Sequence, residues 1–385
     1  MRVLIFEPTG GFWPYAPNIS SAVASQEGVD EVYLLTSKIR ENSQIADVIL
    51  RADCRDMNAD VTRRNPFRWV FGRITSTLQW IYIRNKLVKE LKPDVVHIQY
   101  TPTIIDQLFF PNLKGPYKKV LTVHDVMPLS QTKIHTYGSL KKVYMAADEL
   151  IVHSESNAIE LEEKMHIHGD HVHIIPHLMD QQPTSKDLKA ADDSKRHLNL
   201  EMEADYLLFF GSIRQSKGPQ LAIEALAEVV KTRKNVKLLM AGSLNWDVDM
   251  DAIEARVKEL NLEDHVVFHL GYVDDARVDD YFIASKIIML PYIEFHSQSG
   301  VLLQAYSYET PVVVTNKGSL GETVKADQSG AVAVDTTSQA IAASINDLLS
   351  NEGLYEACII HQRDAINNKY HSKIIAQMTV EIYKK

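Results

Sequence analysis

Short runs of three to six apolar residues recur along this chain, and helix-length stretches separate them. The first set lies at 3–6, 32–35, 95–98, 120–123, 150–152 and 172–175. The second set lies at 207–210, 236–241, 266–270, 287–290, 312–314 and 331–334. Strands that are apolar throughout are typical of parallel sheets with helices on both faces. The pattern therefore predicts an α/β protein with two doubly wound, Rossmann-like domains.

The length of the chain also favours two domains, since 385 residues exceed what one hydrophobic core usually serves. Asp180–Asp205 is polar and charged without apolar periodicity, which predicts the connection between the domains. We expect an N-terminal domain over 1–180 and a C-terminal domain over 181–365. The end of the chain, about 366–385, contains a helical pattern at Ile374–Tyr383 that is free to pack back on the first domain.

The composition of the chain limits which partners and which cell compartments can be expected. The net charge of −9 disfavours a nucleic-acid partner. The chain has two cysteines, Cys54 and Cys358, too few for a disulfide framework and in keeping with a reducing compartment. The N-terminal apolar run is too short for a signal peptide, and we find no run of about 18 apolar residues. We therefore expect a cytoplasmic protein.

The segment Pro291–Thr315 carries a pattern that fits phosphate binding. An apolar strand leads into the polar loop Ser297–Gly300, and an apolar-periodic helix begins at Val301. A helix N-terminus presents free backbone N–H groups and the positive end of a dipole, where phosphate binds readily. The segment therefore indicates the anionic part of a nucleotide-type ligand. An ordinary βαβ unit with a glycine turn would show the same pattern.

The loop Phe210–Pro219 places two cations three residues apart, Arg214 and Lys217, ahead of an amphipathic helix. Arginine supplies a bidentate fork and lysine a point charge, so the pair is suited to a diphosphate. A solvated loop with two surface cations is the alternative. The glycines that bound the loop and the helix that follows it favour diphosphate binding.

Residues that follow strands of the first domain are also candidates, because ligands of open α/β sheets bind beyond the carboxyl ends of the strands. Gly10 and Gly11 follow the first strand and would let a ligand approach the backbone closely, although a tight structural turn needs the same residues. His124 and Asp125 follow the fourth predicted strand. They could contact a substrate, or the histidine could be satisfied by backbone groups.

An acidic motif, Asp247–Asp251, could be taken for a carboxylate metal site. It stands just before a helical pattern, however, and aspartate is favoured at the N-terminus of a helix. We therefore expect a helix cap here and no metal site in the protein.

Residues 61–92 form a basic, aromatic stretch in an otherwise acidic chain. It contains eight arginines and lysines against the single acid Glu90, with Phe67, Trp69 and Trp80 among its aromatics. Such a stretch fits peripheral contact with an anionic membrane, on its inner face for a cytoplasmic protein. An amphipathic helix that buries its aromatics and leaves its cations in solvent is the alternative.

Taken together, these segments resemble a known family. FFGSIRQSKGPQLAIEAL is similar to the G-x-x-R-x-x-K-G segment of family 4 retaining glycosyltransferases, which have the GT-B fold. QSGVLLQAYSYETPVVVTNKGSLGETV resembles their donor-site helix with the strand and turn that follow. DVVHIQY, LTVHDVMP, ADELIVHSESN and VHIIPH match further family segments in the same order, so the resemblance covers nearly the whole chain.

The resemblance implies roles for these residues. Arg214 and Lys217 would hold the diphosphate of a nucleotide sugar, UDP- or GDP-linked. His124 would contact the donor sugar near the reacting carbon. The remaining contacts implied are backbone N–H groups of Ser299, Gly300 and Val301 to the distal phosphate, and Gly10 and Gly11 to the cleft between two facing domains.

The chain departs from the family at two glutamates that usually stand eight residues apart. Alignment on Pro311 puts Gln304 at the second position and His296 at the first. An amide both donates and accepts, so Gln304 could still bind ribose hydroxyls. His296, Glu294 or Gln298 could each contact the donor hexose in place of the first glutamate.

The implied activity is transfer of a hexose from a nucleotide diphosphate sugar to an acceptor hydroxyl, with retention of configuration and without a metal or other cofactor. The basic stretch 61–92 favours a glycan or lipid-linked acceptor in polysaccharide or glycolipid assembly. A soluble enzyme that acts on a sugar phosphate is one alternative. A non-catalytic GT-B protein that binds a partner is another, favoured only by the lost glutamates.

Overall fold

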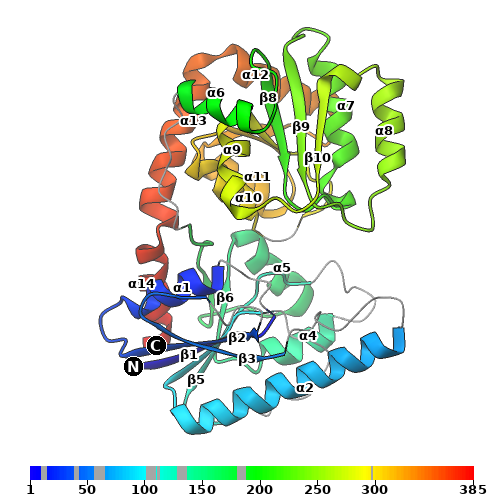
Figure 1. Ribbon diagram of the computed structural model, residues 1–385. Helices are drawn as coiled ribbons and strands as arrows, with labels where there is room; N and C mark the ends of the chain where they lie inside the picture. The colour runs from blue at the N-terminus through cyan, green and yellow to red at the C-terminus, as the bar shows by residue number, and fades with distance from the viewer. Residues whose placement is uncertain are drawn as a thin grey trace. The chain divides into compact units, whose positions relative to one another are not determined.

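The computed structural model of the chain consists of two compact units, shown in Figure 1. One unit comprises Met1–Asp180 with Tyr370–Lys385, and the other comprises Gln181–Lys369. Each unit is described by itself below. The structure describes residues 1–9, 15–38, 43–55, 66–100, 110, 113–127, 137–179, 188–295 and 298–385.

The first unit is built on a seven-stranded parallel sheet with strand order β3-β2-β1-β4-β5-β6-β7. Its strands are β1 (Arg2–Glu7), β2 (Glu31–Ser37), β3 (Val48–Cys54), β4 (Val95–Ile98), β5 (Lys118–Thr122), β6 (Glu149–Val152) and β7 (Val172–Ile174). All six apolar runs predicted for this half of the chain are strands. The α/β class and the parallel sheet are thereby confirmed.

The strand β3 is an addition that the apolar pattern does not predict. It pairs with β2 at the edge of the sheet, and most of its residues are only partly buried. Ile49 is 44% exposed, and Arg51 and Asp53 form an ion pair within the strand at 2.8 Å. An edge strand needs no continuous apolar run, because one side of it faces solvent.

The second unit contains a six-stranded parallel sheet with strand order β10-β9-β8-β11-β12-β13. Its strands are β8 (Asp205–Phe210), β9 (Val236–Gly242), β10 (Val266–Leu270), β11 (Ser285–Leu290), β12 (Val312–Thr315) and β13 (Gly330–Ala333). Each apolar run of the second set has become one of these strands. Two doubly wound sheets, as predicted, make up the protein.

Helices connect the strands in both units. In the first unit they are α1 (Tyr15–Ala24), α2 (Pro66–Leu91), α4 (Tyr137–Tyr144), α5 (Glu155–Met165) and α14 (Ser372–Lys384). In the second they are α6 (Leu188–His197), α7 (Pro219–Val229), α8 (Met250–Glu259), α9 (Val278–Ile283), α10 (Gly300–Ser307), α11 (Gly318–Asp327), α12 (Ser338–Ser350) and α13 (Glu352–Ala365). A π-helical turn, Ile366–Tyr370, joins α13 to α14.

Two details of the helices bear on the sequence predictions. The polar stretch that was expected to be only a connection contains α6, whose short helical pattern is dominated by charged residues. The acidic motif before α8 behaves as expected, because the Asp249 carboxylate accepts the Ala252 N–H at 3.1 Å as the helix cap.

The core of the first unit lies on both faces of its sheet, because side chains alternate along each strand. On one face, Leu4 and Phe6 of β1 belong to a cluster with α2, α4 and α5. On the other face, Val3 and Ile5 of β1 belong to a cluster with α1 and α14. The C-terminal helix α14 therefore packs in the first unit beside α1, although the chain reaches it from the second (Figure 1).

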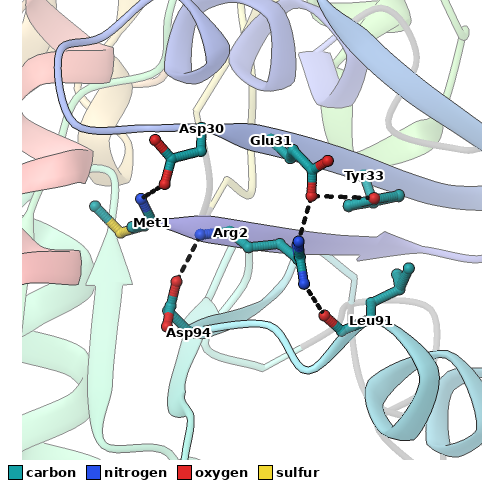
Figure 2. Close-up of polar contacts among 7 residues, drawn as sticks. All are labelled: Met1, Arg2, Asp30, Glu31, Tyr33, Leu91 and Asp94. Atoms are coloured by element: carbon teal, nitrogen blue, oxygen red, sulfur yellow. Dashed lines mark hydrogen bonds and ion pairs between the residues drawn. The ribbon is translucent and has the colours of Figure 1, made fainter.

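Polar contacts tie down the start of β1, as Figure 2 shows. The terminal amino group of Met1 pairs with Asp30 at 2.5 Å, and the Arg2 backbone N–H donates to the Asp94 carboxylate at 2.6 Å. The Arg2 guanidinium donates to Glu31 and to the Leu91 carbonyl, both at 2.5 Å. These contacts hold β1 against the starts of β2 and β4 at the amino edge of the sheet.

The carboxyl edges of the two sheets are where a ligand would bind. In each sheet the strand order reverses beside the first strand, between β1 and β4 and between β8 and β11. Such a reversal leaves a crevice beyond the carboxyl ends of the strands. Residues that follow β1, β4, β5, β8 and β11 are therefore the ones that form candidate sites.

Candidate functional site

In the second unit, the two predicted phosphate-binding segments lie against each other. Gly211 follows β8, and a Cβ at this position would lie 3.5 Å from Val301 Cγ2 and 3.6 Å from Lys217 Nζ. The Lys217 ammonium group and the first turn of α10 are thus brought to the same place. The sequence placed each of them at a ligand-binding edge, and the structure shows that they share it.

Hydrogen bonds fasten the two loops together. The Ser216 carbonyl, in the loop after β8, accepts the N–H groups of Ile293 at 2.9 Å and Glu294 at 3.2 Å. Gly218 ends that loop with φ +69°, and a Cβ there would lie 2.2 Å from the Pro291 carbonyl oxygen. Only glycine allows this close approach of the two backbones.

Lys217 is half-buried, and its ammonium group lies 5.6 Å from the ring centroid of the buried Tyr292. Burial, with a contribution from the nearby charge of Arg214, lowers the pKa of Lys217 to about 8. Arg214 is exposed and donates from Nε to Ser212 Oγ at 3.3 Å. Two cations lie near each other here, and one of them is partly desolvated. A bound anion would offset the repulsion between them.

The first turn of α10 has the features of an anion site. Ser299 is its N-cap, and its side chain accepts the Leu302 N–H at 3.2 Å. Among the first residues of a helix, N–H groups lack acceptors within the helix, so those of Gly300 and Val301 are directed out of the turn. A Cβ at Gly300 would meet no atom within 4 Å among the described residues, so space adjoins this turn.

The other donor-site candidates of this unit have different positions. Gln304 is half-buried one turn further along α10, and Gln298 is half-buried just before the helix. Glu294 is exposed in the loop after β11. His296 lies outside the described residues.

The same edge of the second sheet carries exposed apolar side chains that the sequence analysis did not single out. Trp246 follows β9 and Tyr272 follows β10, and each is 80% exposed. Leu244 and Leu270, at 40% and 42% exposure, accompany them. Because β9 neighbours β8 and β10 neighbours β9, these residues extend away from the loop of Lys217 along the sheet edge. Exposed aromatics at a loop give no periodic signal in the sequence.

In the first unit, His124 lies after β5 and is buried, with 7% exposure. Its Nε2 atom lies 3.2 Å from Gln99 Oε1, and its Nδ1 atom lies 3.1 Å from His153 Nε2. Burial first, then the nearby histidines, holds the pKa of His124 well below 6.5. Both ring nitrogens therefore have partners within the protein, and the ring is neutral at pH 7.

The first residue of α1 also contacts this histidine. The ring of Tyr15 meets His124 edge to face, with centroids 5.4 Å apart, and meets His153 at 5.7 Å. Gly10 and Gly11, which precede α1, lie outside the described residues. Their predicted contact with a ligand stays a prediction.

The residues around His124 are the part of the site that sequence reasoning missed. His97, Gln99 and His153 come from the ends of β4 and β6, which flank β5 in the sheet. Burial lowers the pKa of His153 to about 4 and that of His97 to about 3, in the latter with a contribution from His153. His97 lies within an apolar run and His153 directly follows one, which was the only available signal.

The helix α2 occupies most of the basic stretch, and it combines burial with an exposed apolar surface. Trp80 and Arg84 are buried against the sheet. The exposed apolar surface, called the α2 stripe below, recurs at helical spacing and comprises Val70, Phe71, Ile74, Leu78 and Tyr82. Exposed Lys86 and Lys89 continue the same helix, with Glu90 3.7 Å from Lys86. None of the described helices is both long enough and apolar enough to span a bilayer.

Within the part of the chain that the structure describes, no three His, Cys, Asp or Glu side chains come together as metal ligands would. Cys54 and Cys358 are both buried thiols, one in each unit. The acidic motif at the start of α8 serves as a helix cap, as described above.

Comparison with known proteins extends over both units. The family described as Glycosyltransferase Family 4 matches residues 24–182, and the family described as Glycosyl transferases group 1 matches residues 191–365. HepE from Anabaena, solved in complex with UDP and glucose, superposes with a TM-score of 0.74 over 100% of this chain and 99% of that chain at 14% identity. This chain belongs to the GT-B glycosyltransferases of the family 4 type.

Two curated glycosyltransferases each match about half of the chain. An uncharacterized glycosyltransferase of Methanocaldococcus jannaschii is 28% identical over 190 residues, which are 49% of this glycosyltransferase and 47% of that protein. The D-inositol 3-phosphate glycosyltransferase of Xylanimonas cellulosilytica is 24% identical over 219 residues, 55% of this chain and 51% of that protein. The chain thus spans about half the length of these two relatives.

Proposed function

We propose that this glycosyltransferase moves a hexose-type sugar from a UDP- or GDP-linked donor to an acceptor hydroxyl, with retention of configuration. The observation that carries the donor is the meeting of Lys217 with the first turn of α10 beside Gly211. A partly desolvated cation beside a helix N-terminus offers two adjacent binding points for anions. This arrangement fits a ligand with two linked phosphates. The likeness to HepE, which was solved with UDP and glucose, is consistent with this donor class.

For this sugar transfer, the protein must stabilise the diphosphate as it leaves. The bond between the sugar carbon and the diphosphate oxygen breaks, and the acceptor oxygen bonds to the same face of that carbon. The acceptor proton passes to the diphosphate oxygen, so no covalent nucleophile is needed. Arg214, Lys217 and the dipole of α10 supply the positive charge, and we propose that they do so without a metal.

The other donor contacts that we propose are those that the resemblance to the family implies. We assign the distal phosphate to the N–H groups of Ser299, Gly300 and Val301, and the ribose hydroxyls to Gln304 through its amide. His124 is assigned to the donor sugar. For the role of the usual first glutamate, His296, Glu294 and Gln298 stay candidates.

The exposed aromatics of the sheet edge fit the nucleoside end of the donor. Trp246 and Tyr272 follow the two strands next to β8, on the side away from β11. Neighbouring strands are about 4.8 Å apart, so these side chains lie within a nucleotide's length of the diphosphate loop. Aromatic rings stack on any base, so these side chains fit either a UDP- or a GDP-linked donor.

Calorimetry with UDP and with GDP tests the donor site. Lys217→Ala should weaken binding of the preferred nucleotide by at least about tenfold, the effect of losing a charge-assisted hydrogen bond. Lys231→Ala is the control, since Lys231 is exposed in the same unit and pairs with Glu228. Unchanged binding in Lys217→Ala, or no binding of either nucleotide to the wild type, contradicts the donor assignment. The latter would favour a non-catalytic, partner-binding GT-B protein.

We further propose that the acceptor is lipid-linked or is a growing glycan at an anionic membrane face. The α2 stripe exposes apolar side chains beside Lys86 and Lys89, a combination that binds anionic lipid surfaces by apolar burial and by about 1 kcal/mol for each cation. Phe71, 70% exposed, contributes the largest apolar area expected to insert.

Co-sedimentation with phosphatidylserine vesicles tests this membrane contact. Phe71→Ser should reduce the bound fraction several-fold, because about 2 kcal/mol of apolar transfer is lost. Ile360→Ser is the control, since Ile360 is 60% exposed in the second unit. If the wild type stays in the supernatant even at low salt, the membrane acceptor is excluded. The acceptor would then be a soluble sugar phosphate, as the similarity to D-inositol 3-phosphate glycosyltransferases also allows.

A further inference from the structure

Buried side chains from three neighbouring strands form a continuous hydrogen-bonded chain in the first unit. Its members are His97 of β4, Gln99 just after β4, His124 after β5 and His153 after β6. Gln99 lies 3.0 Å from His97 Nε2 and 3.2 Å from His124 Nε2. None of the four is more than 7% exposed. With water excluded, the position of each proton is set by the partners within the protein.

At one end of this hydrogen-bonded series, the Ile175 carbonyl fixes which nitrogen of His153 carries the proton. Its Nδ1 atom lies 2.9 Å from the Ile175 carbonyl oxygen, which can only accept. Nδ1 therefore carries the proton, and in the neutral ring Nε2 keeps its lone pair. Since Nε2 lies 3.1 Å from His124 Nδ1, the proton between the two rings belongs to His124.

The proton on Nδ1 in turn decides what His124 presents to Gln99. A neutral ring with its proton on Nδ1 has a lone pair on Nε2, so Gln99 must donate to it. The amide orientation with Oε1 at 3.2 Å would instead need a proton on Nε2 and make the ring an imidazolium. A half-turn of the amide, which exchanges two atoms of similar size, satisfies the neutral ring.

The contact with Gln99 raises the pKa of His124, but the titratable groups near His124 do not favour an imidazolium. They are His153, His177, His97 and the ring of Tyr15, and the nearby histidines each lower the pKa of His124. Burial lowers it further. The neutral arrangement is therefore the one that this cluster stabilises.

At the His97 end of this hydrogen-bonded series, the protons can be donated in the same direction. With the amide oxygen toward His97, the His97 Nε2–H donates to it and to Thr122 Oγ1, which lies 2.8 Å away. His97 Nδ1 then accepts the hydroxyl proton of Tyr383, 2.6 Å away on α14. Every donor in the chain thus points from Tyr383 toward Ile175.

We propose that His153 is a positioning residue for sugar transfer, which holds the His124 ring neutral with its proton on Nδ1 and its Nε2 lone pair toward Gln99. The role in transfer rests on the proposed function, in which His124 meets the donor sugar. As the glycosidic bond breaks, positive charge develops on the sugar ring. A neutral ring does not repel that charge, whereas an imidazolium would.

The wild type and four variants test the proton positions by imidazole nitrogen NMR. The full-length protein is labelled with 15N-histidine, and the signals of His124 are assigned by their loss in His124→Gln. His153→Gln retains an acceptor for the His124 Nδ1 proton, whereas His153→Asn retains the donor to Ile175 but no acceptor that reaches His124. His168→Gln, an exposed position of the same unit, is the control.

At pH 7 we expect a protonated Nδ1 and a bare Nε2 at His124 in the wild type, in His153→Gln and in the control. In His153→Asn the proton should move to Nε2, because Gln99 can then turn and accept it. A wild-type His124 that is charged or protonated on Nε2 overturns the proposal. So does a His153→Asn spectrum that matches the wild type.

Turnover of the donor separates this inference from the proposed function. His153→Asn should lower kcat about tenfold, the usual effect of losing one buried hydrogen bond, and His153→Gln should restore most of it. If the NMR result holds but both variants turn over nucleotide sugar as the wild type does, the proton positions stand and the part in transfer fails. If nucleotides do not bind at all, calorimetry has already rejected the donor, and the NMR result still decides the tautomer.

Discussion

The buried histidines make the stability of the first unit depend steeply on pH. His97, His124 and His153 are neutral in the folded protein, with the pKa of His153 lowered to about 4 and that of His97 to about 3 by burial. In the unfolded chain a histidine takes up a proton near pH 6.5. Below that pH the unfolded state binds more protons, so stability falls as pH falls from about 6.5 toward 4.

The size of the effect follows from linkage. Between pH 7 and pH 5, each histidine that stays neutral in the fold lowers the free energy of unfolding by about 2 kcal/mol. Three of them amount to roughly 6 kcal/mol, a large share of the stability of an ordinary domain. His153→Gln removes one titrating group, so the variant should lose about 2 kcal/mol less than the wild type over the same interval.

Urea unfolding at pH 5, 6, 7 and 8 measures this difference. Trp80 is buried in the first unit and donates to the Arg55 carbonyl at 2.9 Å, so its fluorescence reports unfolding of that unit. The measurement is made in a Trp246→Phe background, which removes the tryptophan of the second unit. His168→Gln is the control, because an exposed imidazole is solvated in both states.

The comparison rests on how stability changes with pH, so a uniform loss caused by the substitution does not matter. We expect His153→Gln to retain about 2 kcal/mol more than the wild type on acidification, and His168→Gln to follow the wild type. Equal losses for all three proteins would mean that His153 takes up its proton alike in both states. The description of a neutral, buried cluster would then be wrong.

Other predictions concern the donor site and the helices. Gly218→Ala should destabilise the second unit by several kcal/mol in urea unfolding, since a Cβ there meets the Pro291 carbonyl oxygen; a variant as stable as the wild type would refute the close approach. Gly300→Ala should leave stability unchanged or slightly higher yet weaken UDP or GDP binding in calorimetry, because its methyl group enters the space beside the helix N-terminus. Trp246→Ala should weaken nucleotide binding by about 1–3 kcal/mol if the base stacks there, with no change in melting temperature. Asp249→Ala should cost about 1 kcal/mol through loss of the cap of α8.

Much of the fold could be predicted because its signals are local. Apolar runs predicted every strand of both sheets except β3, whose exposed edge position removes the need for such a run. The charged helix α6 was missed for a related reason, since few of its residues are apolar. The loop with Arg214 and Lys217 could be predicted as a phosphate site because loop, cations and helix start are contiguous in the chain.

The rest of the candidate site could not be predicted, because its parts are joined through space. Nothing local indicates that Lys217 would lie beside the turn that contains Val301, or that Gly218 would pass against Pro291. Trp246 and Tyr272 become recognisable only when β9 and β10 take their places next to β8.

The sequence by itself determined two parallel sheets and the family, and it indicated a candidate diphosphate loop, because apolar periodicity and short motifs are formed by consecutive residues. Only the tertiary structure decided what surrounds His124. His97 and Tyr383 are 286 positions apart and meet because α14 packs on the first sheet. Proton positions in that buried series of hydrogen bonds depend on which donor faces which acceptor. Burial fixes these positions because water cannot substitute for a missing partner.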